Sequence, residues 1–114
     1  MTGEQAIHAF ETVSALTSDM LAAARGGQWD RLAALEADSA RQVALLRDGD
    51  VPALAAPLRA RAASVIRATL DCEAEVRALI HAKMQSLLAE LDHATAELNS
   101  AGTERKLANA YGKV

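Results

Sequence analysis

The sequence contains very few aromatic residues: one phenylalanine, one tryptophan and one tyrosine among 114 residues. Its hydrophobic residues, which make up 51% of the chain, are mostly alanine and leucine. Alanine favours helix but adds little area to a core. We therefore expect a single helical domain, residues 1–114, with a thin, close-packed core and a tendency to use a partner.

Other absences exclude whole classes of function. Cys72 is the only cysteine, so no intramolecular disulfide can form. No apolar run approaches the ~18 residues of a membrane span, and the first residues lack a secretory signal, so we expect a cytoplasmic protein that makes no membrane contact. The net charge is −3, and no basic face for nucleic acid is evident. Arg59, Arg61 and Arg67 are followed by acidic residues, and we interpret them as a solvated helix face rather than a phosphate site.

The residues that carry chemistry are too scattered for an enzyme or a metal site. Glu90 and His93 have the spacing of half a carboxylate-bundle metal motif, but no second copy is present. One cysteine and three dispersed histidines do not make a zinc site. Cys72 lies on an apolar stripe and is most simply a small core residue. We expect no catalytic activity, no metal and no cofactor.

The dominant pattern runs from Leu58 to Leu98, where apolar residues recur every three or four positions without proline or glycine. If this stretch is one helix, it is about 60 Å long at ~1.5 Å per residue. A helix of that length exceeds the width of a small compact domain. Its apolar stripe also widens in the second half. A bundle of three helices can cover only the first half of this stripe.

Cap and turn residues divide the rest of the chain. Thr2 and Gln5 have the spacing of a capping box, and Gly26-Gly27 is a helix stop. The run from Asn99 to Gly102 consists of helix breakers and caps, after which a short helix can follow. The predicted fold is all-α, an antiparallel three-helix bundle with a long third helix and a short C-terminal fourth helix, at about 3–25, 28–47, 55–99 and 103–111.

The wide stripe on the long helix has two interpretations. In the first, the fourth helix or a second copy of the chain completes the core. In the second, this face binds the amphipathic helix of a client protein. The residues alone do not decide between them.

Three segments resemble the FliT-type flagellar export chaperones. Residues 27–36, which begin Gly-Gln-Trp-Asp-Arg-Leu, resemble the start of that family's second helix. The sequence Thr-Leu-Asp-Cys-Glu at 69–73 resembles a stretch of its third helix. Residues 104–112, which end Asn-Ala-Tyr-Gly, resemble its last helix. The order and spacing of the three segments agree with the family over essentially the whole chain.

The resemblance implies a cytosolic chaperone of flagellar type III secretion. Its client would be the filament-cap protein, and it would also contact the export ATPase complex and the export gate. Some members bind a transcription regulator of flagellar genes, and in some the last helix folds back over the client face. The residue roles that follow are client binding by Val76, Ile80, Met84, Leu87 and Leu91, regulation or export-machinery contact by Leu107 and Tyr111, and anchoring of the second helix by Trp29.

Two other hypotheses remain open. The chain can be a structural protein that forms a homodimer through its long helices. It can instead be a regulator that binds a flagellar transcription factor. Sedimentation and recovery of partners from cells distinguish these from the chaperone.

Overall fold

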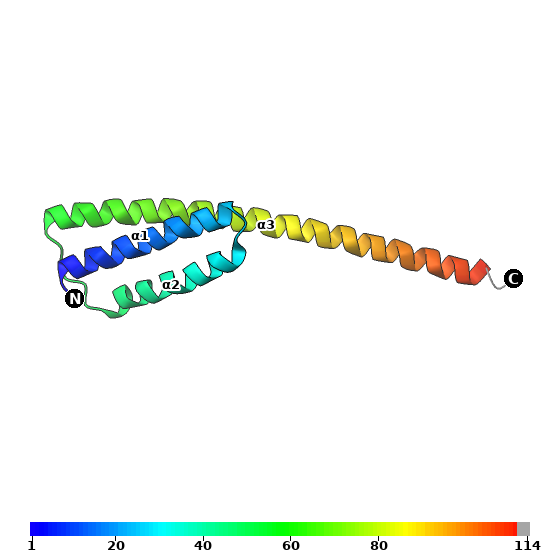
Figure 1. The fold of residues 1–114 in the computed structure, drawn as a ribbon, viewed down its shortest axis with the longest axis horizontal. Coiled ribbons are helices and arrows are strands. Elements are labelled where there is room, and N and C mark those ends of the chain that lie inside the picture. Colours follow the sequence, from blue (N-terminus) through cyan, green and yellow to red (C-terminus); the bar gives the residue numbers. More distant parts are fainter. Residues whose placement is uncertain (112–114) are drawn as a thin grey trace. The chain divides into compact units, whose positions relative to one another are not determined.

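A computed structural model describes the backbone of residues 1–111 and the side chains of residues 1–108. These residues form three helices and no strand: α1 (Gly3–Arg25), α2 (Trp29–Asp48) and α3 (Ala56–Tyr111) (Figure 1). The all-α prediction is therefore confirmed. The chain divides into two compact units, the N-terminal unit Met1–Ile80 and the C-terminal unit His81–Val114, which are described separately.

Helix α1 begins at the predicted capping box. The Thr2 hydroxyl accepts a hydrogen bond from the Gln5 backbone N–H at 3.1 Å, and the Gln5 side-chain oxygen accepts one from the Thr2 N–H at 2.8 Å. Two N–H groups that would lack partners at the helix start are thus satisfied by local sequence.

Helix α1 ends at the predicted glycine pair. Gly27 has a φ of +69°, the left-handed conformation that glycine adopts at little cost. The Gln28 N–H then bonds the Ala23 carbonyl at 2.8 Å, and the Gly27 N–H bonds the Ala24 carbonyl at 3.2 Å. These two bonds form the Schellman arrangement and turn the chain back into α2.

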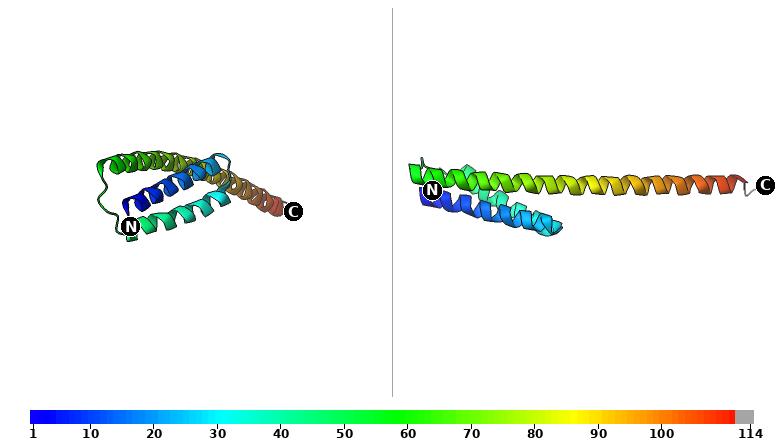
Figure 2. Two further views of the ribbon diagram at one scale, coloured as in Figure 1. Left: turned by 60° about the vertical axis from the view of Figure 1, so that its left-hand side comes forward. Right: turned by 90° about the horizontal axis from the view of Figure 1, so that it is seen from above.

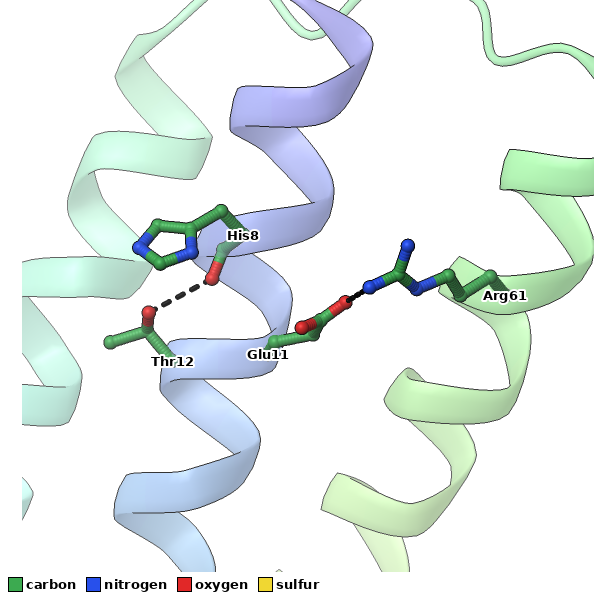
Figure 3. A network of polar contacts seen from close by, with 4 residues as sticks. All are labelled: His8, Glu11, Thr12 and Arg61. Atoms are coloured by element: carbon green, nitrogen blue, oxygen red, sulfur yellow. Dashed lines mark hydrogen bonds and ion pairs between the residues drawn. The ribbon is translucent and has the colours of Figure 1, made fainter.

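The N-terminal unit is an up-down-up bundle of α1, α2 and the first part of α3 (Figures 1 and 2). Arg61 of α3 bonds Glu11 of α1 (Figure 3), and Arg25 of α1 bonds Glu75 of α3 at 2.6 Å. Both pairs join residues 50 positions apart, so α1 and α3 run in the same direction. The short turn between α1 and α2 makes α2 antiparallel to both, as the three-helix bundle requires.

The core of this unit is built largely from small side chains, as the composition predicts. Its buried apolar residues are Ala6, Ile7, Ala9, Val13, Met20, Leu21, Ala23, Ala24, Leu32, Ala62 and Val76. Two buried threonines satisfy their hydroxyls within their own helices: Thr17 donates to the Val13 carbonyl and Thr69 to the Val65 carbonyl, each at 2.8 Å. Polar groups therefore enter this thin core without leaving an unpaired donor.

The prediction of a separate fourth helix at 103–111 is wrong. Helix α3 continues through Asn99 and Gly102 to Tyr111. Among residues 1–111, Gly27 is the only residue with positive φ, so Gly102 does not act as a helix stop. Thr103 donates its hydroxyl to the Asn99 carbonyl at 2.9 Å, a bond compatible with continuous helix. Extending an existing helix avoids the nucleation that a separate two-turn helix would need, and this outweighs the weak helix preference of these residues.

Candidate functional site

A groove opens in the N-terminal unit where α2 lies opposite α3. Small residues in the middle of α2 leave this space open, because Ser39 and Ala40 cannot fill it. The groove is lined by Met20 of α1, by Glu36, Ser39, Ala40 and Val43 of α2, and by Glu73, Val76, Arg77 and Ile80 of α3.

The groove exists because α2 is the least buried helix of the bundle. Leu32, near the start of α2, is its only buried residue, and Val43 near the other end remains 44% exposed. Most of the lining residues are apolar, and three of them, Glu36, Glu73 and Arg77, are charged. A lining of this composition suits the amphipathic helix of another protein.

A second apolar surface lies on the C-terminal unit. None of the side chains described between residues 81 and 108 is buried. The large apolar residues exposed there are Met84, Leu87, Leu88, Leu91, Leu98 and Leu107. Met84, Leu87 and Leu91 follow the three- and four-residue spacing that places side chains on one side of a helix. We name these three residues the α3 stripe.

The predicted client-binding residues fall into two groups. Val76 is only 3% exposed and belongs to the bundle core, so its assignment to an open surface is corrected. It packs with Met20 and Leu32 because its position on α3 faces inward, and it contributes to the floor of the groove. Ile80 is half-buried and also lines the groove. The other three residues form the exposed α3 stripe.

The predicted cover of this surface by Leu107 is not present. Leu107 is exposed and lies on the same continuous helix as Leu91, about 24 Å further along at ~1.5 Å per residue. Contact between them would require a break in α3. Tyr111 is the last residue of α3, and its side chain lies outside the described residues.

Trp29 begins α2 and packs against the core cluster, but it is half-buried rather than fully enclosed. Its contact partners belong to the part of the bundle that contains Met20 and Leu32. The side chain therefore lies where an anchor for α2 is needed, and part of it remains exposed.

The residues considered for metal chemistry do not converge. His93 pairs with Glu97 at 3.1 Å, one turn further on, and not with Glu90. Within the part of the chain that the structure describes, no three His, Cys, Asp or Glu side chains gather into a possible metal site. Likewise, no helix in that part has the length and apolar composition needed to cross a bilayer.

The α2 side of the groove was not identified as a site from the sequence. None of Ser39, Ala40 and Val43 was predicted from the sequence to line a binding surface. The available signal was the adjacent pair of small residues, Ser39 and Ala40, near the middle of α2, where a helix that packs closely on both neighbours would carry larger side chains.

The family comparison now decides the identity of the chain. A family model described as "Flagellar protein FliT" matches residues 7–113. The chain belongs to the FliT family. FliT is a family of flagellar export chaperones and not of enzymes, so the relevant partners are flagellar proteins. A comparison with curated proteins gives no match. The apolar groove and the α3 stripe are thus candidate binding surfaces of a FliT-family chaperone.

Proposed function

We propose that this FliT-family protein holds the flagellar filament-cap protein in the cytoplasm and delivers it to the export apparatus. The client would bind through an amphipathic helical segment near its C-terminus. Two surfaces, one on each unit, are available to its apolar face: the groove, which includes Ile80, and the α3 stripe of Met84, Leu87 and Leu91. The observation that carries this proposal is the run of large apolar side chains left exposed on α3.

The energetic argument concerns these exposed leucines. Burying a leucine stabilises a complex by roughly 1.5–3 kcal/mol. Leu87 and Leu91 are 49% and 61% exposed, so a client helix has apolar area available on both. Neither side chain belongs to the core cluster, so the chaperone can release a client without unfolding.

The first experiment measures binding of the filament-cap protein's C-terminal segment by calorimetry. Leu91→Ser should weaken binding about tenfold, because one apolar contact is lost. Leu45→Ser is the matched control, since Leu45 is 57% exposed on α2 and does not line the groove. Equal affinities for the two variants would contradict the assignment of the α3 stripe.

The groove is tested by filling it. Ala40 is exposed and lines the groove, so Ala40→Arg should obstruct it without disturbing the core. Ala33→Arg is the control on the same helix, because Ala33 is exposed and is not a lining residue. If both variants bind the client as the parent protein does, the groove has no part in client binding.

Delivery would require contact with the export ATPase complex and the export gate. We propose that the end of α3, with Leu107 and Tyr111, supplies this contact. Tyr111→Ala should then reduce capture of these components by the loaded chaperone while leaving client affinity unchanged. Loss of client affinity in this variant would instead assign Tyr111 to the client surface.

Regulation by the C-terminal segment would require α3 to break near Asn99–Gly102. Deleting residues 103–114 should tighten client binding if that segment competes for the α3 stripe. Gly102→Ala favours continuous helix by up to ~1 kcal/mol and should act in the same direction. If neither change alters affinity, the continuous helix is the working state and the segment has no regulatory role.

A second candidate function is self-association through the α3 stripe. The regular spacing of Ile80, Met84, Leu87 and Leu91 is that of a coiled-coil seam, which favours this alternative. Sedimentation with and without the client segment distinguishes the two, because a dimer that persists with client bound requires a different client surface. Recovery of a transcription regulator from cells in place of the cap protein would favour a regulatory role.

A further inference from the structure

A separate apolar surface lies at the other end of the N-terminal unit, away from the proposed client residues. A depression there is lined by Phe10 of α1, by Val51, Pro52 and Leu54 of the connection before α3, and by Arg59, Ala62, Ala63 and Ile66 of α3. Leu70 is not a lining residue, but it follows Ile66 by one helical turn on α3 and is 56% exposed. We name the set Phe10, Val51, Arg59, Ile66, Arg67 and Leu70 the arginine-edged patch.

The three arginines of this segment have different surroundings. Arg61 bonds Glu11 of α1 and ties the two helices together (Figure 3). Arg59 and Arg67 form no ion pair with any residue in the described part of the chain. Both are exposed, and both lie within one or two turns of Ile66. Arg61 therefore helps to hold the bundle together, while Arg59 and Arg67 are available to a partner.

The positions of these arginines define the partner's chemistry. Arg59 and Arg67 are eight residues apart, which is about 12 Å along a helix at ~1.5 Å per residue. The apolar side chain of Ile66 lies between them in sequence. Asp50 and Asp71 are the nearest carboxylates in sequence; Asp50 precedes the segment, and Asp71 directly follows Leu70 and forms no ion pair with Arg67.

We propose that the arginine-edged patch binds a short amphipathic helix of another protein, with two acidic residues about two turns apart and leucine-like residues between them. The apolar residues between the acidic ones would cover Ile66, and an apolar residue one turn further on would cover Leu70. The acidic residues would pair with Arg59 and Arg67, which fix direction and register. Such a contact is small, so the complex should be weak and transient. The proposal is independent of the client function, because it uses none of the groove or α3-stripe residues.

The test uses the full chain labelled with 15N and two synthetic helical peptides. The acidic peptide carries leucines on one face and glutamates eight positions apart, and the basic peptide has lysine in place of each glutamate. The acidic peptide should shift the amide signals of residues 59–70 and of Phe10. Added salt should weaken binding of this peptide. Shifts confined to residues 84–98, or no shifts, would overturn the proposal.

Charge reversal supplies the decisive variant. The double variant Arg59→Glu with Arg67→Glu should weaken binding of the acidic peptide about tenfold and strengthen binding of the basic peptide. Arg105→Glu with Lys106→Glu makes the same change of net charge on the C-terminal unit and should leave both peptides unaffected. If the two double variants behave alike, the effect is one of net charge and the patch is not a specific site.

A second variant tests the apolar contact and protects against a folding artefact. Leu70→Ser should weaken the acidic peptide several-fold with an unchanged unfolding midpoint, because Leu70 is outside the core cluster. Leu98→Ser, on the C-terminal unit, is its exposed-leucine control. Equal shifts of the same amides by inorganic phosphate would overturn the proposal in favour of an anion site. Shifts that depend on protein concentration without peptide would overturn it in favour of a second copy of this chain.

Discussion

The two units of this protein contain similar apolar residues, but these are buried in the N-terminal unit and exposed in the C-terminal unit. In the N-terminal unit, α1 alone buries nine residues, among them Ile7, Met20 and Leu21. In the C-terminal unit, the leucines have the same helical spacing, yet no side chain described between 81 and 108 is buried. Helical periodicity therefore predicts where an apolar face lies but not whether the chain itself covers that face. An uncovered face on a family of export chaperones is best explained by a partner.

Truncating one apolar residue in each unit tests the contrast between the two units most directly. Ile7 is 2% exposed, so Ile7→Ala should lower the free energy of unfolding by about 3 kcal/mol. Leu91→Ala should change it by less than about 0.5 kcal/mol, because the side chain has no core contacts to lose. Urea denaturation followed by circular dichroism measures both, and similar losses for the two variants would refute the contrast.

The second prediction concerns how much Trp29 contributes to holding α2 in the N-terminal unit. Trp29 packs on the core cluster while half-exposed, so Trp29→Ala should cost about 2 kcal/mol, less than for a fully buried aromatic residue. Trp29→Phe retains much of the contact and should cost less than half as much. A loss well below 1 kcal/mol in the alanine variant would mean that Trp29 is not the anchor of α2.

A third prediction concerns the turn that makes α1 and α2 neighbours. Gly27→Ala places a side chain at a φ of +69° and should destabilise the protein by about 1–2 kcal/mol. Gly102→Ala is the matched change in the C-terminal unit, where the glycine is helical and alanine should be neutral or favourable. Thermal unfolding of the two variants should therefore move in opposite directions.

The smallest expected effect belongs to the ion pairs between α1 and α3. Glu11→Gln removes the partner of Arg61, but both side chains are more than a third exposed, so the loss should be about 0.5 kcal/mol or less. In high salt, the free energies of unfolding of this variant and of the parent protein should become equal, because the added ions screen the attraction between Glu11 and Arg61. A loss that persists at high salt would point to packing by the Glu11 side chain instead.

Local signals made the bundle predictable from sequence. The capping box at Thr2 and the glycine pair at 26–27 define α1 with hydrogen bonds between near neighbours, so both ends were located correctly. The start of α2 at Trp29 and its end at Asp48 each lie one residue later than predicted, which is within the ordinary uncertainty of helix boundaries.

The failures arose where the outcome depends on competition or on distant residues. Asn99–Gly102 has the composition of a helix end. Extending an existing helix through these residues nevertheless costs less free energy than nucleating a new helix after them. The groove depends on the separation of α2 and α3 at Ser39 and Ala40, and two small residues on one helix do not specify how far away a distant helix lies. Val76 was placed on an open surface because its stripe continues into exposed positions, whereas the bundle encloses it. The exposed residues Met84, Leu87 and Leu91 keep their predicted client role as a proposal.

The single tryptophan has a practical consequence. Because the indole of Trp29 rests against the bundle interior while keeping one side in water, its fluorescence should report how closely α2 is attached, with no added label. Undocking of this helix should shift the emission to longer wavelength and increase quenching by acrylamide. One intrinsic optical signal can thus follow, in real time, whether a bound protein leaves the scaffold closed or loosens it.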